Sequence, residues 1–587
     1  MQKLKILAMS MLVLVSVTAI LSIDFEYCRA DLHRFGSYEE LKQFMRHREQ
    51  NHPQDHFSYS TRPGMKAELL NAMGALGFSG TNIQVEGVDE ADTVKTDGEY
   101  IYVIAGQKVV IVKAYPVEEA AVLSRITVNG TLEQLFINSE KLVIIYTDNS
   151  WTEPTTFARI YDVSERGNPL LKREIAVDGF YFSSRMIGDY VYVVTRKGTQ
   201  LVDDEVALPK IRCGDDSKIV SATDVYYSDI VEWGYSVTMI VSVNLHEDGT
   251  APAYSPVLLG WASTIYVSLD NIYIAIADGQ STALHRIHVK NGEITYDASD
   301  EVPGTVLNQF SMDEHEGYFR IATTSAARSP NQGNWRLNQQ NNVYVLDMNL
   351  AVVGRLENLA AGEQIHSTRF MGSLCYLVTF RKIDPLFVIK LSDPHNPEVL
   401  GELKVTGYSD YLQPYDENHV IGIGKETVAD GSDLFSWYQG VKISLFDVTE
   451  LSDPVELAKY EIGDRGTDSP VLREHKAFLF DKDKNLLVLP VSVARINESQ
   501  YPDGVPPYAY GELEWQGAYV FNISLEIEAR LTLKGTITHV ENGGVRDSSQ
   551  HVSRVLYIGE VLYTISNHKI KMNSLTDLSV IGELSLN

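Results

Sequence analysis

The chain has 587 residues, and 44% of them are hydrophobic, a proportion that excludes a wholly disordered protein. Its 50 Lys and Arg residues stand against 78 Asp and Glu residues, which gives a formal net charge of −28. A charge of this sign repels nucleic acids and anionic lipid headgroups, so we expect no nucleic-acid partner.

Residues 1–23 have the pattern of an export signal. Lys3 and Lys5 precede an uncharged run from Ile6 to Ile23, as in the charged first region and apolar core of a secretion signal. The run is at the lower limit for crossing a bilayer, which leaves a cleaved signal peptide and a retained membrane anchor as alternatives. Either one predicts a protein outside the cytoplasm, secreted or anchored to the outer face of the cytoplasmic membrane, with membrane contact only through this segment.

Residues 24–80 are predicted to form a helical N-terminal segment. The stretch "GSYEELKQFMRHREQ" begins with Ser37 and Glu40, whose spacing is that of a capping box at the start of a helix.

Residues 81–587 are predicted to form an all-β domain, because short apolar runs alternate there with Gly, Asn, Asp and Pro. A phrase recurs in "YFSSRMIGDYVYVVTR", "IHSTRFMGSLCYLVTF" and "HVSRVLYIGEVLYTIS". The repeated units have four strands each, and four-stranded units repeated radially are typical of a β-propeller. We count nine blades, with eight as the alternative; their first strands are expected near residues 91, 134, 181, 262, 305, 365, 410, 470 and 550. The first blade supplies its own four strands in this interpretation, so closure is expected to depend on packing between the first and last blades.

Three stretches carry a resemblance to a known family: "TNIQVEGVDEADTVKTDGEYIY" (81–102), "GTVLNQFSMDEHEGYFRIATT" (304–324) and "GSYEELKQF" (36–44). The chain resembles the secreted proteins of archaea and bacteria that have a C-terminal β-propeller distantly related to WD40 repeats. The resemblance covers nearly all of the chain after the signal and implies an extracytoplasmic propeller. It carries no agreed activity, and therefore it transfers no catalytic residues.

The acidic stretch 86–97 precedes the first long apolar strand and contains the candidate metal ligands Asp89, Glu90 and Asp92. In a propeller, the loop before an innermost strand lies near the central channel, where carboxylate oxygens could bind Ca²⁺. The alternative is a set of solvated turn residues, partly neutralised by Lys95. The sequence therefore predicts a weak calcium site and leaves this alternative open.

The repeated phrase also supplies candidate binding residues. Arg185, Arg369 and Arg554 occupy the same place in three units, where they are either ligand contacts near the channel or packing residues between blades. Recurrence in several blades favours packing. Tyr181 and Tyr411 lie where innermost strands begin, and their rings are candidates for stacking against a sugar.

Motifs of catalysis such as G-x-S-x-G and H-E-x-x-H are absent from the sequence, and we predict no catalytic residues. The leading hypothesis is an exported, non-enzymatic cell-surface or secreted module that binds a protein or glycan of the envelope. The alternative is an exported hydrolase or lyase whose channel carboxylates act as acid and base. Whether the protein is an enzyme is left open.

Overall fold

A computed structural model describes residues 31–51, 77–150, 152–232, 234–326, 339–380, 384–429, 436–541 and 544–587. The predicted export segment 1–23 lies outside these residues. Within them, no helix is both long enough and apolar enough to cross a membrane.

The predicted N-terminal helix is present as α2 (Tyr38–Asn51). The Ser37 hydroxyl accepts a hydrogen bond from the Glu40 amide at 3.1 Å, and the Glu40 carboxylate accepts one from the Gly36 amide at 2.7 Å. Ser37 therefore caps an amide of the first turn that has no partner inside the helix, as predicted, whereas Glu40 binds the amide of the residue before the cap instead of the amide of Ser37.

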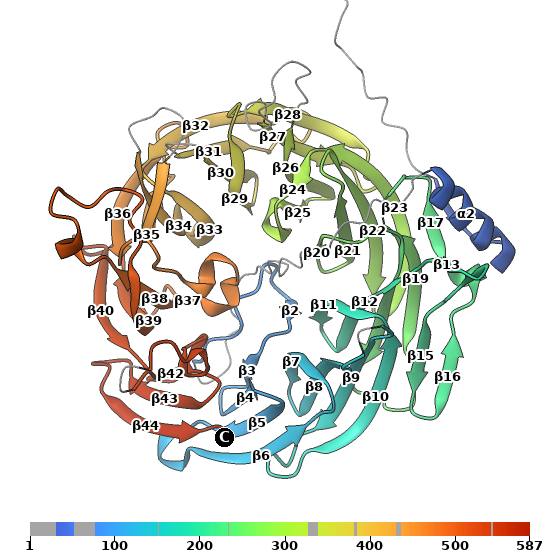
Figure 1. Ribbon diagram of the computed structural model, residues 1–587, viewed down its shortest axis with the longest axis horizontal. Coiled ribbons are helices and arrows are strands. Elements are labelled where there is room, and N and C mark those ends of the chain that lie inside the picture. Colours follow the sequence, from blue (N-terminus) through green and yellow to red (C-terminus); the bar gives the residue numbers. More distant parts are fainter. Residues whose placement is uncertain are drawn as a thin grey trace, which may run out of the picture.

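The rest of the described chain forms a ring of sheets that radiate from a common centre (Figure 1). Nine sheets in the described residues have at least four strands each, and they follow one another in chain order. An all-β propeller of four-stranded blades is therefore confirmed, and the count agrees with nine blades instead of eight.

The first three blades come from the N-terminal part of the ring, and two of them have additional strands. The first blade contains β3 (Val94–Thr96), β4 (Tyr100–Ala105), β5 (Lys108–Lys113) and β6 (Ala121–Thr127). The second contains β7 (Thr131–Asn138), β8 (Lys141–Thr147), β9 (Thr155–Asp162) and β10 (Leu170–Asp178), extended by β15 (Lys210–Cys213) and β16 (Asp216–Ile219). The third contains β11 (Phe180–Ile187), β12 (Tyr190–Gly198), β18 (Ser236–Asn244) and β19 (Ala253–Leu259).

The third blade gains strands at both edges. At its outer edge lie β17 (Tyr226–Ser228) and β1 (Leu32–Arg34), and at its inner edge lies β2 (Val88–Glu90). A small separate hairpin pairs β13 (Leu201–Val202) with β14 (Glu205–Val206). One blade therefore receives two segments from the N-terminal part of the chain, on opposite sides.

The remaining six blades are built from successive strands. The fourth has β20 (Thr264–Val267), β21 (Asn271–Ala277), β22 (Ser281–Lys290) and β23 (Glu293–Pro303), and the fifth has β24 (Thr305–Val306), β25 (Met312–His315), β26 (Tyr318–Ala326), β27 (Gln339–Leu346) and β28 (Val352–Leu359). The sixth has β29 (Gln364–Met371), β30 (Leu374–Phe380), β31 (Asp384–Lys390) and β32 (Glu398–Val405), and the seventh has β33 (Tyr408–Asp416), β34 (His419–Ala429), β35 (Ser436–Asp447) and β36 (Val455–Ile462). The eighth has β37 (Leu479–Asp481), β38 (Leu486–Arg495), β39 (Glu512–Ile523) and β40 (Leu531–Ile537), and the ninth has β41 (Arg554–Ile558), β42 (Val561–Ile565), β43 (Lys569–Ser574) and β44 (Val580–Ser585).

Short 3₁₀ turns connect several strands: η1 (Val117–Glu119), η2 (Ala222–Asp224), η3 (Gln309–Ser311), η5 (Pro470–Leu472), η6 (His475–Ala477), η7 (Glu498–Gln500) and η8 (Ser548–Gln550). Two of them, η5 and η6, explain the largest error in the predicted strand starts. The eighth blade was expected near residue 470, but its innermost strand begins at Leu479 because these turns come first.

Apolar side chains fill the space between neighbouring blades, as radial packing requires. At the junction of the last blade with the first, Ile558 and Tyr563 pack in one buried cluster with Ile101 and Val103. The Tyr563 hydroxyl also donates to the backbone carbonyl of Ala114 at 2.6 Å. The ring therefore closes by packing between its first and last blades, as predicted.

Asp300 on β23 is a buried carboxylate, only 4% exposed, whose Oδ1 accepts a hydrogen bond from the Glu301 amide at 2.8 Å. Burial raises the pKa of Asp300 to about 6, and the neighbouring charges of Glu301 and Asp347 act in the same direction. The ionised carboxylate therefore destabilises the fold.

We expect Asp300→Asn to stabilise the protein relative to the parent at pH 8 and to lose that advantage as the pH falls from about 6 to about 4. The folded carboxyl has a higher pKa than the unfolded one, near 3.9, so the parent loses stability as the pH rises through this window and the amide does not. The pH-dependent part of the difference should be about 1–3 kcal/mol in urea unfolding at pH 8 and pH 4.5. Asp248→Asn, in an exposed turn, is the control, and an equal pH response in both variants would contradict the assignment.

Candidate functional site

Residues 77–92 cross the centre of the ring and are called here the axial strap. The strap begins beside the ninth blade, where Phe78 pairs with Ile558, and it ends beside the second blade, where Asp92 pairs with Leu135. Between these points, β2 pairs antiparallel with the innermost strand of the third blade (Figure 1). The strap thereby adds hydrogen-bonding partners to innermost strands that otherwise have an unpaired edge.

The first half of the strap makes neutral polar contacts with other blades. The Asn82 amide donates to the Tyr411 hydroxyl and to the backbone carbonyl of His475, both at 3.2 Å. The Gln84 amide donates to the carbonyls of Gln309 and Met312, both at 3.1 Å. Two side chains thus bind carbonyl or hydroxyl oxygens of the fifth, seventh and eighth units of the ring.

The second half of the strap carries the three predicted metal ligands, and each lies beside a different cation. The Asp89 carboxylate pairs with Lys95 at 2.7 Å, Glu90 pairs with Arg185 at 2.9 Å, and Asp92 pairs with Arg554 at 2.9 Å. Glu90 and Asp92 are almost fully buried. A buried carboxylate requires such a partner, because the charge has lost its hydration.

A second lysine supports the same stretch of backbone. Lys476 of η6 donates to the carbonyl of Ala91 at 2.7 Å, while Lys95 donates to the carbonyl of Glu90 at 2.5 Å. Burial alone would raise the pKa of Asp92, but the charges of Arg554 and Lys476 hold that pKa below its ordinary value. The carboxylate of Asp92 is therefore ionised at neutral pH.

The repeated arginines lie on innermost strands and face the strap or its neighbours. Arg185 pairs with Glu90 and also donates to the side-chain oxygen of Gln309 at 3.1 Å. The Arg369 guanidinium lies 4.9 Å from the centre of the Phe310 ring. Its Nε and Nη1 atoms have no hydrogen-bond partner among the described residues, and burial lowers the pKa of Arg369 to about 10.

The two predicted tyrosines lie in the same region. Tyr411 is buried and donates to Gln413 at 2.6 Å, and Tyr181 is partly buried, with its hydroxyl 2.8 Å from that of Ser184. Burial raises the pKa of Tyr181 to about 12. A role for Tyr181, Arg185, Arg369 and Tyr411 in ligand binding stays a prediction, and in this structure three of the four are almost fully buried.

The three predicted calcium ligands do not come together in the structure as a metal site requires. In the part of the chain that the structure describes, one group of three potential metal ligands has its ligand atoms close together: Asp31, His33 and Asp229. Asp89, Glu90 and Asp92 do not form such a group among these residues. A calcium site formed by the strap acids stays a prediction. Their ion pairs with Lys95, Arg185 and Arg554 explain the acidic residues at these positions without a metal ion.

Sequence reasoning recognised Lys95 as a neutralising charge but missed Lys476 and the contacts that the Asn82 and Gln84 side chains make from the strap. Lys476 lies far from the strap in the sequence, in "REHKAF", and has no marked spacing that would indicate its role. The polar residues Asn82 and Gln84 in the otherwise apolar "TNIQV" were the available signal, because buried amides require specific partners.

Comparisons with known proteins agree with this architecture. A family model described as a beta propeller domain matches residues 78–578. An uncharacterized protein of Methanocaldococcus jannaschii is 30% identical over 498 residues, which cover 70% of this chain and 74% of that protein. An uncharacterized protein of Archaeoglobus fulgidus is 24% identical over 606 residues, which cover 87% of this chain and 85% of that protein. A crystal structure of a protein from Lactobacillus plantarum aligns with a TM-score of 0.33 and 11% identity over 62% of this chain and 93% of that one, a similarity that carries no argument.

We expect Asp92→Asn to destabilise the fold by about 3–5 kcal/mol, because it removes the carboxylate 2.9 Å from the largely buried Arg554 and leaves the more distant Glu474 carboxylate, at 3.8 Å, to balance that charge. Unfolding in urea measures the loss. The control is Glu119→Gln, which removes an ion pair with Lys113 at the surface and should cost less than about 1 kcal/mol. Similar small losses in both variants would show that the buried pair contributes little to the fold.

The predicted calcium site has its own test. If Asp89 and Asp92 bind Ca²⁺, calcium at about ten to a hundred times its Kd should stabilise the parent by roughly 1–3 kcal/mol, and Asp89→Asn with Asp92→Asn should abolish that gain. Thermal melts of parent and double variant, each with calcium and with a chelator, give the two increments. Equal calcium-induced gains in the parent and the double variant would show that these acids form ion pairs and do not bind calcium.

Proposed function

The chain belongs to the beta propeller domain family, and from that premise we propose that it is an exported, non-enzymatic module that binds an envelope glycan on the loops of its seventh and eighth blades. The observation that carries the proposal is a cluster of exposed aromatic rings around a buried arginine. Export rests on the pattern of residues 1–23.

The aromatic cluster joins three separate segments. Trp437 and Tyr438 come from β35, Tyr510 comes from the loop between β38 and β39, and Arg465 comes from the connection between the two blades. The Arg465 guanidinium lies 4.4 Å from the ring centre of Trp437, 4.6 Å from that of Tyr438 and 5.5 Å from that of Tyr510. Cation–π contacts of this kind hold the rings in place.

Hydrogen bonds to the backbone hold the loops of the cluster in place, while its tyrosine rings are exposed to solvent. The backbone amide of Gly511 donates to the carbonyl of Arg465 at 2.7 Å, and Gln439 donates to the carbonyl of Pro507 at 3.0 Å. Tyr508, whose ring centre lies 6.1 Å from that of Trp437, and Tyr510 nevertheless remain 63% and 60% exposed. Rigid aromatic side chains lose little conformational entropy on binding, so an exposed and preorganised set is typical of a recognition surface.

The chemistry of the cluster favours a neutral glycan. Ring faces can stack on the apolar face of a sugar, while tyrosine hydroxyls donate and accept hydrogen bonds at its edge. The net charge of −28 disfavours an acidic polysaccharide. Arg465 is only 8% exposed, so its charge stabilises the rings and is not presented to solvent.

Asp92 of the strap and Glu474, which precedes η6, lack the pKa pattern that the alternative of a hydrolase or lyase needs. Acid–base chemistry needs two carboxyls whose pKa values are separated, with one of them protonated near neutral pH. Burial would raise the pKa values of both Asp92 and Glu474, but nearby cations, Arg554 and Lys476 among them, hold both below their ordinary values. Neither carboxyl is then available as a general acid.

We expect the full-length protein to bind neutral polysaccharides and the variant Tyr508→Ala with Tyr510→Ala to bind at least about tenfold more weakly, since hot-spot aromatics typically contribute 2 kcal/mol or more. Affinity electrophoresis through gels containing neutral, uronic-acid or sulfated polysaccharides measures the effect. Val580→Ala with Ile581→Ala, on the exposed outermost strand β44, is the control. Failure of every polysaccharide to bind, or equal binding by both double variants, would contradict the proposal, whereas capture of an envelope protein through the same tyrosines would replace the glycan with a protein ligand.

A further inference from the structure

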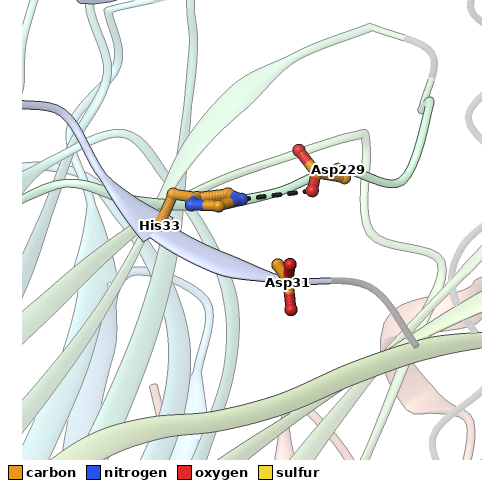
Figure 2. Close-up of side chains that lie close together, drawn as sticks. All are labelled: Asp31, His33 and Asp229. Carbon is orange, nitrogen blue, oxygen red and sulfur yellow. Dashed lines mark hydrogen bonds and ion pairs between the residues drawn. The ribbon is translucent and has the colours of Figure 1, made fainter.

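A second group of polar side chains lies at the outer edge of the third blade, away from the strap. Asp31 directly precedes β1, His33 lies within β1, and Asp229 directly follows β17 (Figure 2). The Nε2 atom of His33 lies 3.1 Å from Oδ2 of Asp229, and one ligand atom from each of the three side chains lies within 4.8 Å of the other two.

The strand register forces this convergence. Leu32 pairs with Ser228 in an antiparallel ladder, so the next residues outward, Asp31 and Asp229, lie opposite each other. His33 is two residues from Asp31 and shares its side of the strand. Two carboxylates placed directly across an antiparallel pair repel each other and destabilise the pairing, and a positive charge between them would relieve this repulsion.

No lysine or arginine supplies that charge within the part of the chain that the structure describes. Among the described residues, Asp229 has an ion pair only with His33, and Asp31 has none. The neighbouring Arg34 lies over the Tyr226 ring instead, with its guanidinium carbon 4.1 Å from the ring centre. This cluster therefore differs from the strap acids, each of which has its own lysine or arginine.

We propose that Asp31, His33 and Asp229 bind a divalent transition-metal ion such as Zn²⁺, which clamps the N-terminal strand to the outer edge of the propeller. An imidazole nitrogen with two carboxylate oxygens suits Zn²⁺, whereas Ca²⁺ prefers six to eight oxygens. Tetrahedral Zn²⁺ with bonds near 2.0–2.1 Å places its ligand atoms about 3.3 Å apart, so the group would have to contract from separations of up to 4.8 Å, and a fourth position would remain for water.

The clamp has a structural consequence for the whole molecule. β1 follows the predicted export or anchor segment, and its ladder with β17 is only three residues long. A metal ion shared by Asp31, His33 and Asp229 would tie residues 196 positions apart at the point where the N-terminal segment joins the ring.

The test measures Zn²⁺ binding to the untagged full-length protein by isothermal titration calorimetry after treatment with a chelator. We expect a site of one ion per chain that His33→Ala and Asp31→Asn each weaken at least about tenfold, since even the loss of a residue that only orients a ligand costs 10–100-fold. Circular dichroism in the presence of chelator verifies that the variants are folded.

Two controls separate this site from adventitious binding at surface histidines. His246 lies 3.3 Å from Asp189 with similar exposure, and no third ligand joins this pair among the described residues. His419 lies between Asp416 and Asp447, of which Asp416 is also paired with Lys482. His246→Ala and His419→Ala should bind Zn²⁺ as the parent does. The proposal is overturned if the parent binds no stoichiometric Zn²⁺, if His33→Ala binds as tightly as the parent, or if a control variant loses the site instead.

Discussion

The ion pair between Asp92 and Arg554 joins the first blade's leading segment to the innermost strand of the last blade, and the closed ring depends on this junction. The two residues are 462 positions apart, and Arg554 contacts both carboxylate oxygens of Asp92 at 2.9–3.0 Å. Apolar packing at the same junction supplies non-directional stabilisation, because burial of apolar area favours any close contact. A different pairing of blades would leave a buried charge without its partner, which is strongly destabilising. We therefore infer that this ion pair determines which blades meet and in which register.

The sequence predicted the ring well because its signals are local. Alternating apolar residues, turn residues and the repeated Ser, Arg and Gly placed most first strands close to their observed starts, such as 181 against Phe180 and 365 against Gln364. The eighth start was misplaced since η5 and η6 bury apolar residues such as Val471 and Ala477, which resemble a strand in the sequence. The partners of the strap could not be predicted, because a buried ion pair and a solvated acidic turn have the same local composition.

The three repeated arginines show how one asymmetric segment breaks the symmetry of a repeated ring. Arg185 and Arg554 both lie on innermost strands and find carboxylates, because the acidic half of the strap passes their blades, although Arg554 lies farther from its hairpin turn than Arg185 does. Arg369 occupies the position of Arg185 on the sixth blade, yet its guanidinium lies against the Phe310 ring. The half of the strap that carries Asn82 and Gln84 presents amides to carbonyls and a hydroxyl, so it offers no charge to an arginine. The order of amides and acids along residues 82–92 therefore matches the distribution of partners around the ring.

The strap also constrains the order in which the structure can form. The third blade has N-terminal segments at both edges, β1 outside and β2 inside, and neither can pair until strands from residues 180–259 are in place. The beginning of the strap needs β41 of the last blade as well, since Ser79 exchanges hydrogen bonds with Tyr557. Contacts of such sequence separation form late, because the entropy of loop closure is lost before the contact stabilises the chain. We infer that the strap docks after the blades that it contacts have formed, and that the Asp92–Arg554 pair, which needs the last blade, forms after the pair of Glu90 with Arg185 of the third blade.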